Sequence, residues 1–327
     1  MTSPKNTSER ILITGGAGYI GSVTAHILIS RGFEVSVIDD CSTGHADAVP
    51  ADARFVQATL QDRSAIQEAL RDCSSVIHFA GKSLVNESVS HPDLYWQINV
   101  EGSRNLIEGM RASNIDRLVF SSSASTYGEP DMLPITEDAR THPTNPYGET
   151  KLAVEAMISQ EAKTHGMAGM SLRYFNVAGA LETENGWIGE RHDPETHLIP
   201  NTLRSTSSRP IEIFGSEWKT PDGTCIRDYV HVIDLVEAHL SALNALKPST
   251  HAILNLGSGH GYSVREVLQT ASDVLGRAIP QVEAPVRRGD PAILVADISR
   301  ASSELNWEPH RDLRKMIEDC AKSMGLN

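Results

Sequence analysis

The sequence of 327 residues predicts an α/β fold, in which a doubly wound parallel sheet is interleaved along the chain with a smaller α/β lobe. The first observation is that, up to Phe175, short β-branched runs alternate with segments of helical length, which is the pattern of a parallel sheet covered by helices on both faces. The second is that this rhythm ends after Phe175 in a stretch rich in Gly, Pro, Asn and Thr, which indicates long loops. The third is the run HAILNLGSGHG at 251–261, which is typical of a late strand that returns to the main sheet. Together they indicate a Rossmann-type architecture with a second lobe.

Each predicted strand is a short run of apolar and β-branched residues. In chain order these runs are ILIT, EVSVI, RFV, SVIHF, RLVFSS and MSLRYF. The helices between them carry apolar residues three and four positions apart, so that one face of each helix can be buried. They are expected at 19–31, 62–71, 92–112 and 147–165.

These elements divide into two parts that alternate along the chain. We expect the main domain to comprise 1–175, with 226–258 returning to it, and the second lobe to comprise 176–225 and 259–327. Ligands of open α/β sheets bind at the carboxyl ends of the strands, so the main domain is expected to hold a cofactor and the second lobe a substrate.

Composition and charge disfavour several classes of function. The formal net charge of -13 at pH 7 disfavours binding to nucleic acid or to an anionic membrane surface. The sequence has neither a run of about eighteen apolar residues nor an apolar segment near its start, so we expect no membrane span, no secretory signal and a cytoplasmic protein. Its 4 cysteines are scattered without a CxxC pair, and most of its 13 histidines are expected to be ordinary surface or core residues. We therefore expect free thiols and no metal site.

A glycine-rich turn follows the first predicted strand. TGGAGYIG places Gly15, Gly18 and Gly21 between that strand and a helix. Glycines allow a tight turn and let a pyrophosphate approach the helix N-terminus, which supplies N–H donors. The second strand ends at Asp39, whose carboxylate can accept the hydroxyls of an adenosine ribose and repel a 2′-phosphate, so the pattern favours NAD over NADP. Asp40 is an alternative for this role, and a strand-end cap is the alternative interpretation of Asp39.

A second pattern predicts acid–base chemistry. The helix that begins in PYGETKLAVE places Tyr147 and Lys151 four residues apart on one face. A phenol, with a reference pKa of about 10, is a poor base at neutral pH, and a neighbouring ammonium favours the phenolate. The run RLVFSSSASTYG ends a strand in hydroxyls, and Ser123 can hydrogen-bond a substrate oxygen together with Tyr147. Each residue alone also has an ordinary interpretation, as an exposed tyrosine, a solvated lysine or a turn serine.

Several motifs in order carry a family resemblance. TGGAGYIG, HFAG, FSSSASTYG, PYGETK, RYFNVAGA, RDYVHV and RRGD together resemble the UDP-galactose 4-epimerases of the extended short-chain dehydrogenase/reductase superfamily, from about Ile11 to Trp307. The resemblance implies an NAD-dependent isomerase that interconverts UDP-glucose and UDP-galactose through a 4-keto intermediate. It also implies that the main domain binds NAD and that the second lobe binds the UDP-sugar.

The resemblance further implies roles for individual residues. The implied catalytic residues are Ser123, Tyr147 and Lys151. The implied cofactor-binding residues are Gly15, Gly18, Tyr19, Ile20, Gly21, Asp39, Asp40, Phe79, Ala80, Gly81, Asn99, Tyr147, Lys151 and Tyr174. The implied substrate-binding residues are Ser123, Asn176, His197, Leu198, Phe214, Arg227, Arg287 and Asp290.

Two of the arginines also have a reason that is independent of the family. A dianionic diphosphate bound to a protein with a net charge of -13 needs local bidentate donors, and Arg227 and Arg287 are the candidates. The alternative interpretation of each arginine is a structural ion pair, with Asp228 or Asp290 as the partner.

The sequence departs from the family where the adenine is expected. RFVQATLQD has Thr59 at the position where relatives usually carry an aspartate that holds the adenine amino group. We therefore expect the adenine end of NAD to be held less tightly, or to be held by Gln57, Gln61 or Asp62 instead.

Two further departures concern single positions. Lys82 follows HFAG one position earlier than the lysine of some relatives, so both an NAD contact and a solvated lysine are open. Leu294 stands where some relatives carry a tyrosine after RRGD. If Leu294 faces the sugar C2 substituent, we expect preference for UDP-glucose and UDP-galactose with weak turnover of N-acetylated sugars, and an ordinary core leucine is the alternative.

Other functions on the same fold are weighed against these residues. A 4,6-dehydratase of this superfamily carries an Asp-Glu pair just after the strand-end hydroxyl, where this chain has Ala124 and Ser125. A net dehydrogenase with an apolar substrate would have little use for Arg227 and Arg287. A 4-epimerase of N-acetylhexosamine or pentose nucleotides and a non-catalytic nucleotide sensor stay open as alternatives. We also expect a homodimer through the helices at 92–112 and 147–165.

Overall fold

The computed structural model describes residues 9–286 and 291–326. The chain forms two compact units. Unit 1 comprises the described residues of Met1–Thr126, Asn145–Leu172 and His239–Ile253. Unit 2 comprises the described residues of Tyr127–Thr144, Arg173–Ala238 and Leu254–Asn327.

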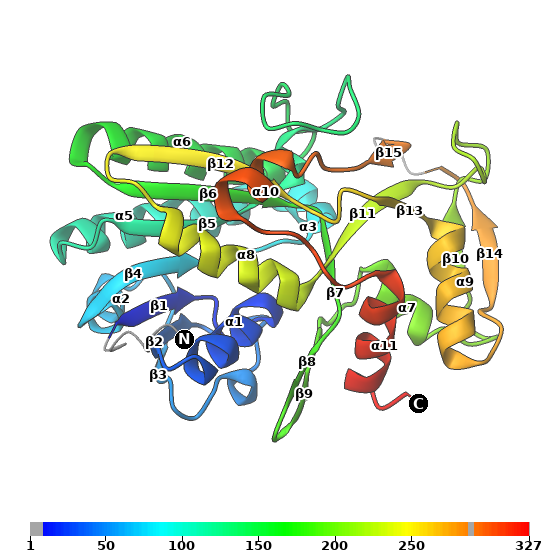
Figure 1. The fold of residues 1–327 in the computed structure, drawn as a ribbon, viewed down its shortest axis with the longest axis horizontal. Coiled ribbons are helices and arrows are strands. Elements are labelled where there is room, and N and C mark those ends of the chain that lie inside the picture. Colours follow the sequence, from blue (N-terminus) through cyan, green and yellow to red (C-terminus); the bar gives the residue numbers. More distant parts are fainter. Residues whose placement is uncertain (1–8, 287–290, 327) are drawn as a thin grey trace. The chain divides into compact units, whose positions relative to one another are not determined.

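The largest sheet has seven strands in the order β12-β6-β5-β4-β1-β2-β3 (Figure 1). β1 pairs in parallel with both β2 and β4. The next pairs outward, β2 with β3 and β4 with β5, are parallel as well. This order, with the first strand inside the sheet and later strands on both sides of it, is the doubly wound arrangement that the alternation of elements predicts. The strands are β1 (Arg10–Thr14), β2 (Glu34–Asp39), β3 (Arg54–Gln57), β4 (Cys73–His78), β5 (Arg117–Ser123), β6 (Ala168–Tyr174) and β12 (Thr250–Leu256).

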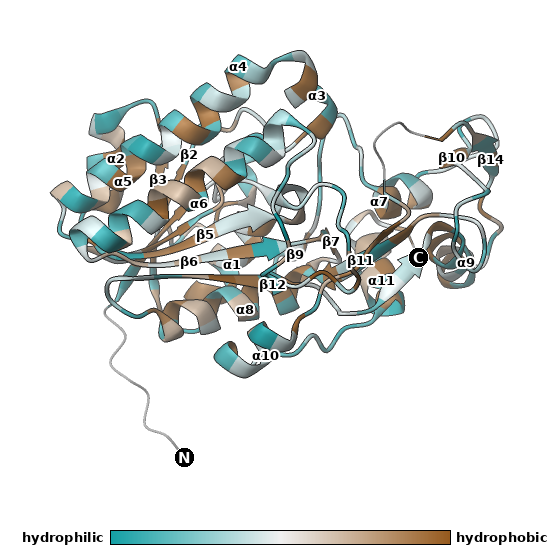
Figure 2. Cartoon of the chain, turned by 90° about the horizontal axis from the view of Figure 1, so that it is seen from above, coloured by the Kyte–Doolittle hydropathy of each residue, from teal (hydrophilic) through white to brown (hydrophobic). Residues whose placement is uncertain are grey.

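Helices cover both faces of this sheet. In Figure 2, α2, α5 and α6 lie on one face and α8 lies on the other, and the hydrophilic sides of α5 and α6 point away from the sheet. The helices are α1 (Tyr19–Ser30), α2 (Arg63–Leu70), α3 (Val85–Ser90), α4 (Pro92–Tyr95), α5 (Gly102–Ala112), α6 (Pro146–His165) and α8 (Val232–Ala245). Shorter helical stretches are η1 (Ala46–Ala48), the π-helical η2 (Trp96–Glu101) and η3 (Ala124–Thr126).

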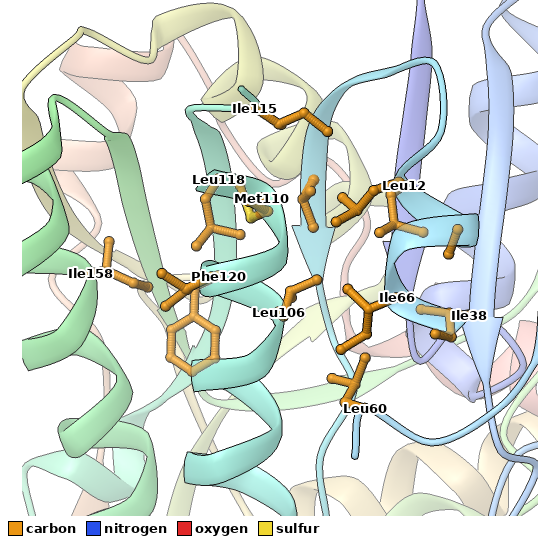
Figure 3. Close-up of a cluster of buried hydrophobic side chains, with 14 of the residues drawn as sticks. Leu12, Ile38, Leu60, Ile66, Leu106, Met110, Ile115, Leu118, Phe120 and Ile158 are labelled. Atoms are coloured by element: carbon orange, nitrogen blue, oxygen red, sulfur yellow. The ribbon is translucent and has the colours of Figure 1, made fainter. Parts of the chain in front are cut away.

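A large hydrophobic cluster of unit 1 lies between the sheet and the helices α2, α5 and α6. Leu12 and Phe120 from the strands meet Ile66, Leu106 and Ile158 from the three helices (Figure 3). Burying one such side chain contributes roughly 1.5 to 3 kcal/mol to the free energy of folding. The apolar runs of the sequence therefore stabilise the packing of the sheet against these helices.

Among its described residues, unit 2 is built on short strands, four complete helices and the first half of α8. β11 (Ile226–His231) pairs with β7 (Asn176–Ala178), β13 (Gly261–Ser263) and β15 (Ile293–Leu294). β10 (Ile211–Phe214) pairs with β14 (Gln281–Ala284), and β8 (Leu181–Thr183) with β9 (Gly186–Ile188). The helices are α7 (Leu198–Leu203), α9 (Val264–Leu275), α10 (Ser299–Leu305) and α11 (Leu313–Ser323).

The structure divides the chain differently in detail from the boundaries expected above. The part of 226–258 that joins the large sheet is β12, whereas β11 belongs to the small sheet of unit 2. A run of alternating or β-branched residues identifies a strand, but it does not specify which sheet the strand joins. Among the described helices, none combines the length and the apolar character that a membrane span requires.

Candidate active site

The glycine-rich turn after β1 is required by the packing of the protein itself. Gly15 has a φ of +71°, and a Cβ on it would lie 2.6 Å from the backbone nitrogen of Ala80. A Cβ on Gly21 would lie 2.1 Å from the carbonyl oxygen of Gly15. These two glycines therefore let α1 start directly against the end of β1.

Gly18 differs from the other two glycines. A Cβ on it would meet one described atom within 4 Å, the Gly15 carbonyl oxygen at 3.3 Å. It is the N-cap of α1, whose first turn begins with Tyr19 and Ile20, both half-buried, and contains no acidic residue. A helix start with a bare glycine and no carboxylate suits a bound pyrophosphate, so the turn fits NAD.

Asp39, at the end of β2, points into this turn. Its Oδ2 accepts a hydrogen bond from the Ala17 N–H at 3.0 Å and its Oδ1 accepts one from the Cys41 N–H at 2.8 Å. Burial raises the pKa of Asp39, although these backbone N–H groups oppose the effect. Asp40 instead accepts from the Ser42 N–H at 2.9 Å in an exposed turn. Of the two carboxylates, Asp39 is the one aligned with the glycine turn.

Of the three side chains expected to replace an aspartate at Thr59 in holding the adenine, two already have partners within the protein. Thr59 is exposed. Asp62 caps α2 by accepting from backbone N–H groups, and Gln61 donates to the Gln97 carbonyl at 2.9 Å. Gln57, exposed at the end of β3, is the third candidate.

The segment after β4 is held by Asn99 from the π-helical stretch. Asn99 Oδ1 accepts from the Lys82 N–H at 2.8 Å, and its Nδ2 donates to the Lys82 carbonyl at 3.0 Å and to Thr150 Oγ1 at 3.1 Å. A Cβ on Gly81 would lie 3.0 Å from Asn99 Oδ1. The Lys82 ammonium pairs with Glu87 at 3.0 Å, so its charge is used within the protein.

A buried chain of hydrogen bonds ties the same segment to β1. The Ala80 N–H donates to Thr14 Oγ1 at 3.2 Å, and Thr14 Oγ1 lies 2.6 Å from His78 Nδ1. His78 Nε2 lies 2.8 Å from Ser103 Oγ, which donates to the Asn99 carbonyl. Since Ser103 uses its only proton there, it accepts from His78 Nε2, and Thr14 donates to His78 Nδ1. In the sequence His78 is only a part of the HFAG motif, which does not predict its role as a link.

Phe79 and Tyr174 complete the predicted cofactor residues. The ring of Phe79 lies 4.8 Å from that of His239, centroid to centroid. Tyr174 is half-buried at the end of β6 and falls in unit 2.

The three predicted catalytic residues come together in unit 1. Asn145 caps α6 by accepting from the Gly148 N–H at 2.9 Å, which places Tyr147 in the first turn. Ser123, at the end of β5, hydrogen-bonds the Tyr147 side chain. Lys151 Nζ donates to the Ser121 carbonyl at 2.8 Å and lies 5.8 Å from the centroid of the Tyr147 ring.

Burial and hydrogen bonds set the charge states of these groups. Burial raises the pKa of Tyr147, and the hydrogen bond with Ser123 lowers it in part. Burial lowers the pKa of Lys151 to about 8, and the charge of Glu155 opposes this effect. Glu155 lies one turn further along α6, is buried, and accepts from Ser122 Oγ at 2.6 Å. Sequence reasoning missed Glu155, because a glutamate in a helix is usually solvated.

Unit 2 contains a pocket of about 590 Å³. Five predicted substrate-binding residues line it, namely Asn176, His197, Leu198, Phe214 and Arg227. Arg287 and Asp290, the remaining two predicted for this lobe, lie outside the described residues.

The surroundings of Arg227 explain how the pocket wall is held. Arg227 Nη1 donates to the Ile226 carbonyl at 2.9 Å, and β15 places Leu294, which is half-buried, in register with Arg227. The carboxylate of Asp228 accepts from the backbone N–H groups of Ser258, at 2.6 Å, and of Ala296, at 3.1 Å. Asp228 thus serves the packing of unit 2.

Comparisons with known proteins agree with this geometry. Residues 11–257 match the NAD dependent epimerase/dehydratase family. The chain is 49% identical over 315 residues to the UDP-glucose 4-epimerase of Corynebacterium glutamicum, and the match covers 95% of this chain and 94% of the relative. It is 47% identical over 317 residues to the UDP-glucose 4-epimerase of Streptomyces lividans, covering 95% of each chain. The crystal structure of UDP-glucose 4-epimerase from Brucella ovis in complex with NAD has a TM-score of 0.92 and 40% identity, and the match covers 98% of this chain and 99% of that one.

Proposed function

The chain belongs to the NAD dependent epimerase/dehydratase family, and we propose that it is an NAD-dependent isomerase that interconverts UDP-galactose and UDP-glucose. The observation that carries the proposal is the set formed by Ser123, Tyr147 and Lys151 in unit 1, which also holds the glycine turn. Full-length relatives named UDP-glucose 4-epimerase support the choice of reaction.

Unit 1 holds the cofactor in this proposal. The turn at Gly15, Gly18 and Gly21 takes the pyrophosphate, and Asp39 takes the adenosine ribose. When held by these residues, NAD would supply the acceptor for the hydride of C4 of the sugar. Asn99 and His78 keep the segment after β4 in place beside the end of β1.

The acid–base steps fall to three side chains. Tyr147 as phenolate takes the proton from O4 of the sugar while C4 loses its hydride to the cofactor, which together give a 4-keto sugar nucleotide, and Tyr147 gives the proton back in the return step. Ser123 donates its single hydroxyl proton to the phenolate, which favours the charged form of Tyr147. The Lys151 ammonium, which is buried and fixed by the Ser121 carbonyl, supplies positive charge near the Tyr147 ring.

Unit 2 holds the nucleotide in this proposal. The pocket residues Arg227 and Asn176 bind the UDP portion, so that the hexose itself is held by few contacts. Inversion at C4 requires the keto sugar to present its other face, and this is possible when UDP is gripped tightly and the hexose loosely.

The alternative reactions lack their residues. η3 follows Ser123 with Ala124 and Ser125, so the acid and base that a dehydratase places there are absent from these two positions. A nucleotide sensor would not need a tyrosine and a lysine arranged around a strand-end serine. UDP-sugars other than the glucose and galactose pair stay open as further substrates.

We also propose a homodimer and a place in galactose metabolism. What supports the dimer is a group of exposed apolar side chains on α3 and at the start of η2, with exposed fractions of 40% for Val85, 63% for Val89 and 41% for Trp96. Val85 and Val89 lie one turn apart on α3, and contiguous exposed apolar side chains mark interaction sites. Light scattering of the purified protein measures the mass of the particle in solution, and a mass of one chain, 35.6 kDa, would contradict the dimer.

The test of the reaction is incubation of the purified protein with UDP-galactose and separation of the products by anion exchange. We expect UDP-glucose with no lasting absorbance of NADH. The matched control is Tyr147→Phe, which keeps the ring and removes the oxygen, and should lower turnover by at least about a hundredfold while NAD binding changes little. Accumulation of NADH or of a 4-keto-6-deoxy product excludes the proposed reaction.

A further inference from the structure

Four side chains that the proposed reaction does not need as a group lie together in unit 2. Glu190, His192, Glu195 and His197 each offer one ligand atom, and these atoms all lie within 4.8 Å of one another. They come from one short segment, ERHDPETH, with the spacing E-x-H-x-x-E-x-H. The expectation of no metal site rested on the absence of cysteine pairs and on histidines taken singly, and neither of these signals detects a mixed cluster of glutamates and histidines.

The carboxylates of this cluster are buried and incompletely satisfied. The side chain of Glu190 is 2% exposed and that of Glu195 is 3% exposed. Among the described residues, Glu190 Oε2 and Glu195 Oε2 have no hydrogen-bond partner. A buried carboxylate oxygen without a partner carries a desolvation penalty, which a bound cation would offset at these two atoms.

The imidazoles gather on one oxygen of this pair. His197 Nδ1 contacts Glu190 Oε1. His192 Nδ1 lies 2.7 Å from the same oxygen, but without a hydrogen bond of acceptable geometry. Both imidazole nitrogens thus lie against one carboxylate oxygen, and the second oxygen of Glu190 is left without a partner among the described residues.

Most of the cluster is fixed before any ligand binds. Glu195 Oε1 accepts from the N–H groups of Thr196, at 2.8 Å, and His197, at 2.9 Å. A Cβ on Gly189, just before Glu190, would lie 2.4 Å from Ser323 Oγ, so the backbone there is packed against α11. The ring of His192 lies 5.6 Å from that of His197, centroid to centroid, so it packs against the other members of the cluster.

We propose that Glu190, His192, Glu195 and His197 bind one divalent transition-metal ion, with Zn²⁺ as the reference ion. Two imidazoles and two carboxylates form a complete tetrahedral set for Zn²⁺, with bonds of about 2.0 to 2.2 Å. A closed set of four protein ligands is typical of a structural site. The ion fixes the start of α7, where His197 and Leu198 line the pocket of unit 2.

The charge of the ion also suits its place. His197 faces a pocket that we propose for a dianionic diphosphate, and two carboxylates stand directly behind it. A divalent cation neutralises this pair of negative charges and removes their repulsion of the substrate.

The test uses untagged protein that is stripped with a chelator, desalted, loaded with Zn²⁺ or Co²⁺ and desalted again. Metal content by mass spectrometry should be about one ion per chain, and Co²⁺ should give the visible absorbance of a four-coordinate site. His192→Ala and Glu195→Gln should each bind at least about a hundredfold more weakly. Glu195→Gln keeps an oxygen for the two backbone N–H groups, and circular dichroism verifies that each variant is folded.

The control is His310→Ala, which removes a histidine of the same unit outside the cluster and should bind the metal like the original chain. The proposal is overturned if folded protein retains no metal, or if either cluster variant binds as tightly as the control. A thiolate-to-Co²⁺ charge-transfer band also overturns it, because the proposed set contains no sulfur and Cys320 is buried within electrostatic reach of Glu190 and Glu195.

Discussion

At the scale of single residues, the hydroxyl of Ser123 has more influence on Tyr147 than the spacing of the sequence indicates. The spacing of Tyr147 and Lys151 predicts that the ammonium lowers the pKa of the phenol. In the structure, the hydrogen bond with Ser123 lowers this pKa, and Lys151 is turned to the Ser121 carbonyl. The three residues could be predicted because strand and helix signals flank them, but their division of roles depends on side-chain geometry that no spacing encodes.

Ser123→Ala tests this division of roles. Loss of the hydroxyl should raise the pKa of Tyr147, because burial then acts without the opposing hydrogen bond. The phenolate is the active base, so the acidic limb of the kcat profile should move to higher pH, and activity at neutral pH should fall about tenfold for each pH unit that the limb moves. Ser125→Ala is the control. An unchanged midpoint in Ser123→Ala would mean that another group sets the pKa of Tyr147.

The adenine end of the cofactor site gives a second prediction at this scale. Thr59→Asp should tighten NAD binding about five- to a hundredfold, which corresponds to the roughly 1 to 3 kcal/mol of one charge-assisted hydrogen bond. Thr59→Val is the matched control, since it has the same shape without a polar atom. Affinity for NAD is measured by titration calorimetry. If Thr59→Asp and the original chain bind equally, a residue such as Gln57 already holds the adenine.

At the scale of secondary structure elements, His78 links β4 to β1 and to α5. It is 1% exposed, and burial, helped by the charge of Lys151, lowers its pKa to about 3. The HFAG motif identified the end of a strand, but a single sequence could not show that Thr14 and Ser103 would meet this ring. Similarly, the sequence assigned 226–258 as a whole to the main domain, whereas β11 joins the small sheet of unit 2, because the sheet that a short strand joins is determined by packing and not by its own pattern.

The neutral state of His78 should make folding sensitive to acid. Between pH of about 6.5 and 3 the unfolded chain binds a proton on this residue and the folded chain does not, so stability should fall with decreasing pH by up to about 1.4 kcal/mol per unit. His78→Gln cannot titrate and should show a shallower dependence. Urea unfolding between pH of about 7 and 5 measures both slopes, with His310→Ala as the control. Identical slopes for His78→Gln and the control would contradict a buried neutral imidazole.

At the scale of the whole molecule, the large sheet and the order of its motifs were predictable, because parallel strands, glycine turns and helix starts all leave local patterns. The second unit was predictable only as a lobe. Its pocket gathers residues from 176 to 282, and its proposed metal cluster lies in a loop segment without periodicity. The fold thus follows from local signals, whereas the details of the substrate lobe follow from long-range packing.

The central claim is that one hydride leaves C4 of the sugar and returns to it within a single site. The most direct measurement uses UDP-galactose carrying deuterium at C4, with purified protein, and locates the label in the product by NMR and mass spectrometry. We predict UDP-glucose that retains deuterium at C4 and no net NADH, because the hydride that was taken is the hydride that returns. Loss of the label to solvent, or its accumulation in NADH, would contradict hydride return.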